Sequence, residues 1–124
     1  MNNLSFGKRG EEAAVDFLKV NGYKILSRNF KTKLGEVDII ACDKDTYCFI
    51  EVKTRISDSF GLPKEAVSKS KQRQIAKAAL MFLKQKSLFD KKARFDVVSI
   101  MYQNRSPVID LIKNAFELNE PFSY

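Results

Sequence analysis

The chain has 124 residues, of which 30% are charged and 44% hydrophobic, and its formal net charge is +7. This length suits one packed domain, and no run of about 18 apolar residues is present that would span a membrane. The sequence also contains no histidine, which excludes every mechanism that relies on an imidazole base. We therefore predict a single domain over residues 1–124, with no membrane partner.

The residue types that are present limit the chemistry further. The first ten residues lack the apolar core of a signal peptide, so we expect a cytoplasmic protein in which Cys42 and Cys48 are reduced thiols. Two cysteines without histidine make a structural zinc site implausible. Hydrolytic chemistry in this chain must use carboxylates, lysine and a hard, oxygen-binding cation such as Mg²⁺ or Mn²⁺.

The positive charge is concentrated in the middle of the chain. Residues 53–94 carry 12 basic and 3 acidic side chains, whereas residues 1–52 carry 8 of each. A polyanion-binding surface needs such a surplus, but an ordinary lysine-rich helix has the same composition. Composition alone leaves both interpretations open.

The chain begins with a predicted helix over residues 6–21. Ala14, Phe17 and Leu18 fall on one side at helical spacing, and Gly22 suits the left-handed position that follows a helix. Residues 23–30 are predicted to form the first strand, and a basic turn follows it.

The next two predicted strands form a hairpin. Two apolar, β-branched runs, 37–42 and 47–53, flank a polar break that we expect to turn near Lys44. If the two runs pair antiparallel, Asp38 lies close to Glu51 across the ladder.

Three charged side chains would then converge on this hairpin. Residues i and i+2 of a strand point to the same face, so Glu51 and Lys53 share one face, near Asp38, while Ile50 points to the other. A partly exposed ion-pair cluster is the plain interpretation of such a trio. The neighbouring Phe49 and Ile50 indicate a buried strand, however, where charged side chains are costly unless they pair or hold a cation.

The second half of the chain continues with a polar loop over residues 54–63, beside the expected site. Residues 64–87 are predicted to be mostly helical, with Ser68 or Ser70 as the cap of its longer part. Strands are expected at 93–102 and 108–112. This order of helix, three strands, helix and two strands favours an α/β fold, in which helices flank a mixed central sheet of about five strands.

The second helix carries a basic stripe opposite its apolar side. Ile75 and Phe82 belong to the apolar side, and Lys69, Arg73 and Lys77 to the basic one. A solvated helix face explains the stripe as well as phosphate contact does.

The residue identities in these motifs are more specific evidence of function than their charge. Asp38, followed after 12 residues by Glu51-Val52-Lys53, looks like the metal-binding signature of the PD-(D/E)xK nucleases, although Val37 replaces the proline. Further matching segments are Gly10 to Leu18, Gly22-Tyr23, Arg28-Asn29, Gly35 to Asp38, Phe49 to Arg55, Lys71-Gln72 and Arg94 to Val98. On these motifs the chain resembles the YraN family of small bacterial endonuclease-like proteins along nearly its whole length. That family is similar in turn to archaeal Holliday junction resolvases, within the restriction-endonuclease-like fold.

The resemblance implies roles for particular residues. Asp38 and Glu51 would be metal ligands for Mg²⁺ or Mn²⁺, and Lys53 the catalytic lysine. Glu11 would be the helix-borne carboxylate that joins the catalytic and metal site. The expected nucleic-acid contacts are Arg55, Lys69, Lys71, Gln72, Arg73 and Lys77.

Three functions follow as hypotheses. The first is a metal-dependent nuclease that hydrolyses DNA, with branched recombination or repair intermediates among its candidate substrates. The second is a catalytically inactive nucleic-acid-binding module with the same fold. The third is a protein adaptor whose contact surface includes Phe116, Phe122 and Tyr124. A homodimer is suggested only by analogy with junction resolvases.

Overall fold

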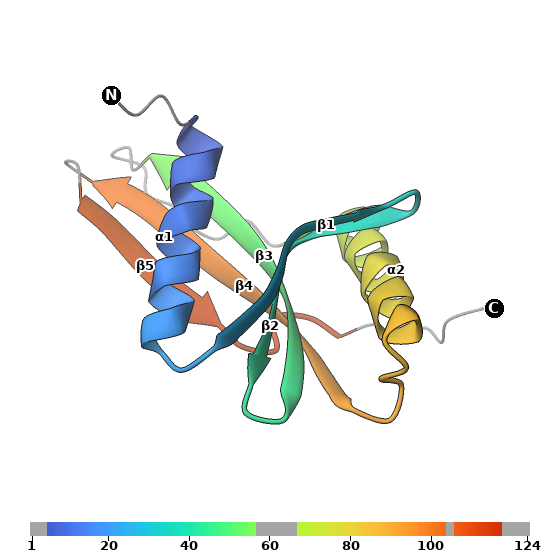
Figure 1. The fold of residues 1–124 in the computed structure, drawn as a ribbon. Helices are drawn as coiled ribbons and strands as arrows, with labels where there is room; N and C mark the ends of the chain where they lie inside the picture. Colours follow the sequence, from blue (N-terminus) through green and yellow to red (C-terminus); the bar gives the residue numbers. More distant parts are fainter. Residues whose placement is uncertain (1–4, 57–66, 104–105, 118–124) are drawn as a thin grey trace.

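The computed structural model describes residues 5–56, 67–103 and 106–117. In these ranges it contains two helices and five strands, in the order α1 (Phe6–Val20), β1 (Lys24–Thr32), β2 (Gly35–Asp43), β3 (Thr46–Ile56), α2 (Lys69–Gln85), β4 (Lys92–Gln103) and β5 (Ser106–Ile112) (Figure 1). The predicted α/β fold is confirmed, because a mixed five-stranded sheet is flanked by two helices, consistent with a restriction-endonuclease-like core. Among the described helices, none is long and apolar enough to cross a membrane.

The five strands lie in the sheet in chain order. Neighbours are antiparallel except β3 and β4, which run parallel. A parallel pair cannot be joined by a tight turn, and α2 lies in the connection between these two strands. The predicted hairpin is also confirmed, because Asp43 pairs with Thr46 and leaves Lys44 and Asp45 as its turn.

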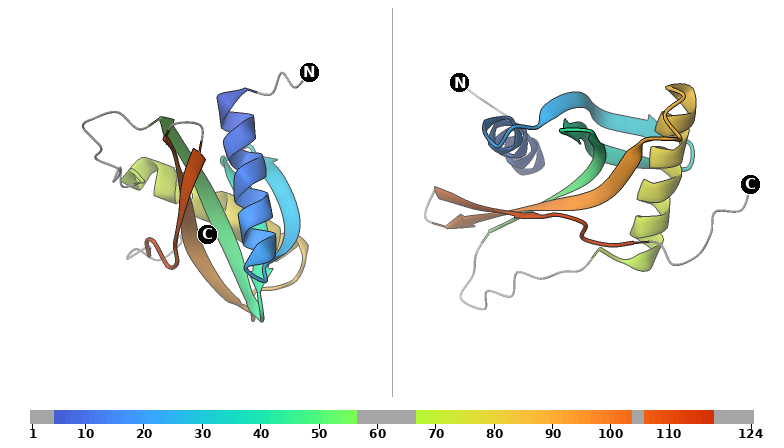
Figure 2. Two further views of the ribbon diagram at one scale, coloured as in Figure 1. Left: turned by 90° about the vertical axis from the view of Figure 1, so that its left-hand side faces the viewer. Right: turned by 90° about the horizontal axis from the view of Figure 1, so that it is seen from below.

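Each helix covers a different face of the sheet, as the two views of Figure 2 show. In β3, Cys48 and Ile50 pack with α1 residues such as Leu18. Phe49 instead packs with Phe82 of α2. The alternation of a strand therefore places Glu51 on the α2 face.

Part of β2 separates from β3 at the upper end of the hairpin. Backbone pairing of the two strands is present as far as Ile39 with Ile50, whereas β2 remains paired with β1 as far as Gly35. The β1–β2 end thus extends over α2 (Figure 1). There Gly35 lies so close to the Gln74 backbone of α2 that no Cβ would fit.

Two predicted boundaries change in the structure. Strand β3 continues to Ile56, so the loop expected from residue 54 begins later, because residues 54–56 pair with β4. Helix α2 starts at Lys69, where the Ser68 hydroxyl accepts a hydrogen bond from the Lys71 backbone N–H. The rest of the predicted loop and the first residues of the predicted helix lie outside the described residues.

The C-terminal aromatic residues have different outcomes. Phe116 stacks on Phe95 with ring centroids 4.9 Å apart, so it belongs to the core on the α2 face. Phe122 and Tyr124 lie outside the described residues. Phe116 is thus packed against the core and only partly exposed.

A buried ion pair stabilises the lower end of the sheet. Asp96 is fully buried, and the Arg94 guanidinium donates to it from Nε at 2.9 Å. The same guanidinium donates to Tyr23 and Asp43 through Nη2, and the Asn114 backbone N–H donates to Asp96. These bonds join the residue before β1, the end of β2, strand β4 and the segment after β5.

We expect Arg94→Met to lower the free energy of unfolding by about 3–5 kcal/mol, because the buried Asp96 carboxylate would lose its cation. Urea unfolding followed by circular dichroism measures this change. Lys92→Met is the matched control, since Lys92 and Asp45 form an exposed pair at 3.6 Å that contributes roughly 0–1 kcal/mol. Equal effects of the two substitutions would contradict the structural role of Arg94.

Candidate active site

Two carboxyl groups meet where β2 separates from β3. The Val52 backbone N–H donates a 2.8 Å hydrogen bond to Asp38 Oδ2, so a side chain replaces the backbone partner that β2 no longer supplies. Glu51 lies beside it on the α2 face and is only 6% exposed. The predicted proximity of Asp38 and Glu51 is present, because each carboxyl group influences the pKa of the other.

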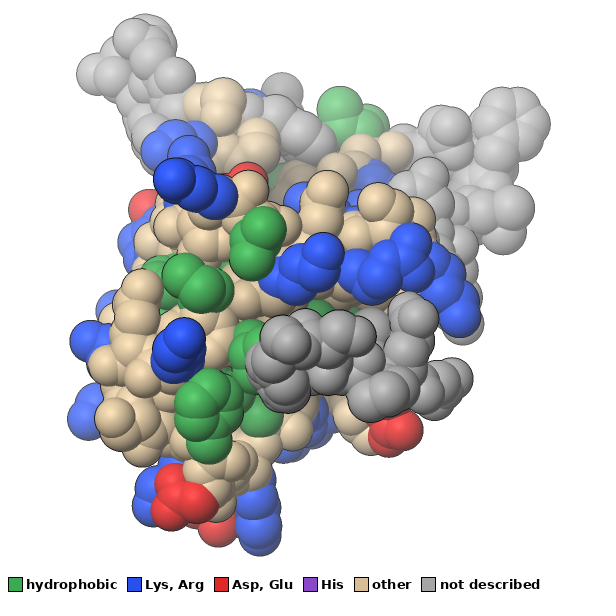
Figure 3. Space-filling model, turned by 90° about the vertical axis from the view of Figure 1, so that its right-hand side faces the viewer, with side chains coloured by type: hydrophobic (Ala, Val, Ile, Leu, Met, Phe, Trp, Pro, Cys, Tyr) green, Lys and Arg blue, Asp and Glu red, His purple; other side chains and the backbone are tan. Residues whose placement is uncertain are grey.

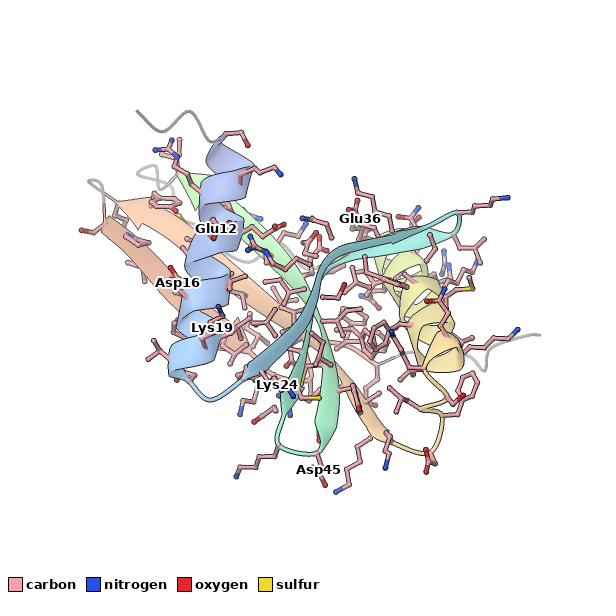
Figure 4. The ribbon with its side chains drawn as sticks, in the orientation of Figure 1. Glu12, Asp16, Lys19, Lys24, Glu36 and Asp45 are labelled. Carbon is pink, nitrogen blue, oxygen red and sulfur yellow. The ribbon has the colours of Figure 1, made fainter. Side chains whose placement is uncertain are left out.

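Their surroundings make it costly for both groups to be ionised. Burial, followed by the charge of Asp38, raises the pKa of Glu51 to about 7. Burial also raises the pKa of Asp38, an effect opposed mainly by its hydrogen bond from Val52. The Glu36 carboxylate adds repulsion toward Asp38; it lies on β2, in the part of the hairpin that extends over α2 (Figure 4). The pair therefore favours any bound positive charge.

Two lysines supply positive charge to this pair. Lys53 Nζ lies 3.9 Å from Glu51 Oε2. Lys71 is half-buried on α2, in helical register with Ile75 and Phe82 of the core on this face. The charge of Lys71 lowers the pKa of Glu51 more than the charge of Lys53 does.

The donor atoms fit a hard divalent cation. Glu51 Oε1 is buried and, within the described residues, has no hydrogen-bond partner, which is costly for a carboxylate oxygen unless an ion binds it. Carboxylate oxygens are the ligands that Mg²⁺ and Mn²⁺ prefer. Asp38 and Glu51 could hold such an ion.

Glu11 lies apart from this pair. Its helix, α1, covers the opposite face of the sheet, and its Oε1 accepts hydrogen bonds from Asn29 at 3.0 Å and Arg28 at 3.4 Å. Among the described residues, no group of three or more carboxylates and thiols is close enough to hold a metal ion. The structure therefore brings Asp38, Glu51 and Lys53 together. Glu11 of α1 is instead bound by Arg28 and Asn29 of β1.

The expected nucleic-acid contacts on α2 divide into two groups. Lys69, Arg73 and Lys77 are exposed on α2, and Lys and Arg side chains form a band across this side of the molecule (Figure 3). Lys71 and Gln72 are half-buried, and the Gln72 amide donates to the Val67 carbonyl at 2.8 Å. These two residues face inward, away from the exposed stripe.

Arg55 belongs to the other side of the site. It is half-buried on β3 and follows Lys53 on the same face of the strand. It thus extends the positive charge along β3, away from Glu51.

Sequence reasoning missed three features of the site. The orientation of Lys71 could have been found from its spacing to Ile75. The approach of Glu36 to Asp38 follows from their i, i+2 spacing in a strand. The contact of Asn29 with Glu11 had no signal beyond the Arg28-Asn29 motif.

Comparisons with known proteins agree on one family. Residues 10–100 match the model of the family described as "Uncharacterised protein family UPF0102". A UPF0102 protein of Geobacter metallireducens is 50% identical over 118 residues, covering 95% of this chain and 97% of that protein. UPF0102 proteins of Geotalea uraniireducens and Caldicellulosiruptor saccharolyticus are 52% and 49% identical, over 94% of this chain and 93% and 100% of their own lengths.

The raised pKa of Glu51 predicts how metal-free stability depends on pH. The folded protein holds the Glu51 proton up to about pH 7, whereas the ordinary value is 4.5, so this group's contribution to stability is lost as pH rises through that window. Glu51→Gln cannot ionise and should remove that loss. Urea unfolding in EDTA, from about pH 5 to about pH 8, measures both proteins.

The control for this experiment is Glu12→Gln, because Glu12 is exposed and pairs with Arg28 at 2.6 Å. We expect this variant to follow the wild-type pH profile. Added Mg²⁺ should stabilise the wild type at the upper end of the range more than Glu51→Gln. Parallel pH profiles of the wild type and Glu51→Gln would contradict the burial of an ionisable pair.

Proposed function

The chain belongs to the UPF0102 family, which is the YraN family that its motifs indicated, and we propose that it is a metal-dependent endonuclease acting on DNA. One observation carries this function: Asp38 and Glu51 are packed together with raised pKa values, and Glu51 has a buried oxygen without a described partner. Titratable groups in such a state are typical of functional sites. Lys53, 3.9 Å from Glu51, completes a set of groups suited to phosphodiester hydrolysis.

Asp38 and Glu51 would hold Mg²⁺ or Mn²⁺. When bound, such an ion polarises the phosphate and makes water a better nucleophile near neutral pH. The hydrogen bond from the Val52 N–H fixes Asp38, so its carboxylate is oriented before any ligand arrives. The largely buried surroundings of Glu51 strengthen every electrostatic interaction there.

The lysines have a complementary task. Lys53 would orient the attacking water and stabilise the negative charge that develops on the phosphate. Lys71 is the second cation near the carboxylates, and we assign it to the site and not to the outer surface of α2. Neither lysine can bind a metal while protonated, so both act as charges and hydrogen-bond donors.

The outer surface of α2 would bind the flanking phosphates. Helix α2 has no acidic residue, and its exposed Lys69, Arg73 and Lys77 would contact the DNA backbone without reading its sequence. Arg55 would contribute from β3. A substrate held there would reach the carboxylates from one side. Branched DNA, in a protein that we expect to act in the cytoplasm, is the candidate substrate that the family resemblance favours.

We expect purified protein to nick DNA with Mg²⁺ or Mn²⁺, and EDTA to abolish the activity. Glu51→Gln and Lys53→Met should each lower kcat by about 100-fold or more, because the first removes a metal ligand and the second removes a positive charge that stabilises the phosphate. Gel assays on four-way junction, flapped, single-stranded and duplex DNA measure this activity. Glu12→Gln serves as the exposed control and should cleave as the wild type does.

The same assay decides between the nuclease and an inactive binding module. Salt-sensitive DNA binding without cleavage, under any divalent ion, would favour the binding module. Cleavage that persists in the Glu51→Gln/Lys53→Met double variant would indicate a different site or a contaminating nuclease.

Lys71 and Lys77 should have separable effects. Lys71→Met should lower kcat with little change in KM, since its charge lies beside the carboxylates. Lys77→Met should instead weaken binding and reduce the slope of log Kd against log salt by about 1, which corresponds to the loss of one phosphate contact. Single-turnover rates and salt titrations measure the two effects, and identical behaviour of the variants would contradict this division of α2.

A further inference from the structure

Two neighbouring residues of β1, Arg28 and Asn29, have no part in the proposed mechanism, yet both bind Glu11. The Asn29 amide donates to Glu11 Oε1 at 3.0 Å, and Arg28 Nη2 lies 3.4 Å from the same oxygen. Arg28 also binds the exposed Glu12 at 2.6 Å. The Glu11 side chain is only 14% exposed, so β1 holds it in one position.

The backbone of Asn29 is unusual for a strand. Its φ is 55°, in the left-handed region, although the residues on either side pair normally, Arg28 with Ile39 and Phe30 with Val37. Asparagine tolerates this conformation better than most residues do. Such conformations persist where the surrounding structure requires them, and they cluster at functional sites.

The position of Asn29 connects the two parts of the site. In the β1–β2 register its position falls opposite that of Asp38, because both residues lie between the two pairs just described. Asp38 is also the residue at which β2 separates from β3. Asn29 therefore shapes the backbone opposite Asp38 while its amide holds Glu11 of α1.

We propose that Asn29 is a positioning residue that holds Glu11 outside the Asp38–Glu51 pair, so that Glu11 acts on the site through solvent and is not a metal ligand. This inference rests on the proposed nuclease function. It agrees with the absence, among the described residues, of a group of three carboxylates and thiols that could hold a metal. Arg28 supports the same position through its ion pair with Glu11.

The first test measures Mg²⁺ binding by calorimetry. Glu11→Gln should keep an affinity close to that of the wild type, whereas Asp38→Asn and Glu51→Gln should weaken it by about tenfold or more. An equal loss in Glu11→Gln would make Glu11 a ligand and overturn the proposal.

The second test separates the amide of Asn29 from its backbone. Asn29→Gly keeps the left-handed conformation without strain and removes the amide, so we expect kcat to fall about 10- to 100-fold with KM nearly unchanged. Asn29→Ala should show the same loss of kcat and a lower melting temperature than Asn29→Gly, because alanine resists a positive φ. Asn114→Gly is the matched control, since Asn114 has a φ of 54° at the opposite end of the sheet, and its kcat should equal that of the wild type.

The third test asks whether Asn29 acts through Glu11. In a double-variant cycle, Asn29→Gly should lower kcat little further once Glu11→Gln is present, and the two substitutions should couple in metal-free unfolding as well. Additive effects would overturn the proposal while leaving the nuclease intact. A wild-type protein that nicks no DNA would overturn the nuclease, and this proposal with it.

Discussion

The site depends on the burial of two carboxyl groups against each other. Strand pairing alone would bring backbone to backbone at this position, but β2 separates from β3 after Ile39. Asp38 then bonds to the Val52 N–H that the ladder leaves free, and the alternation of β3 directs Glu51 to the same face. The geometry that satisfies one backbone donor thus creates a concentration of negative charge that the fold does not fully compensate.

A second buried carboxylate in the same sheet shows that this lack of compensation is local. Asp96 is more deeply buried than Glu51, yet it is surrounded by donors from Arg94 and Asn114. Glu51 has a second carboxyl group and a lysine at 3.9 Å. The first arrangement is what a structural ion pair requires, and the second is what a cation-binding site requires.

The amino-acid pattern predicted most of the fold and the central part of the site. Alternating apolar runs determine the strands, and the i, i+2 spacing of Glu51 and Lys53 places them on one face. Helical spacing determines which lysines of α2 are exposed. The position of Glu11 could not be predicted in this way, since it depends on Asn29, eighteen residues away, and on a positive φ that no periodicity reveals. The separation of β2 from β3 was also hidden, because the apolar pattern of β2 continues through it.

Helix α2 contributes both to the packing of the fold and to the charge of the site. Its apolar side, through Ile75 and Phe82, packs on the sheet, and Lys71 continues that side toward its N-terminal end. Burying a lysine there would be unfavourable over an apolar surface, but the carboxyl pair supplies the opposite charge. The exposed lysines face solvent without any acidic neighbour on the helix. One basic helix can therefore act on two anions, the carboxylates beneath it and a polyanion outside, and its orientation on the sheet decides which lysine serves each.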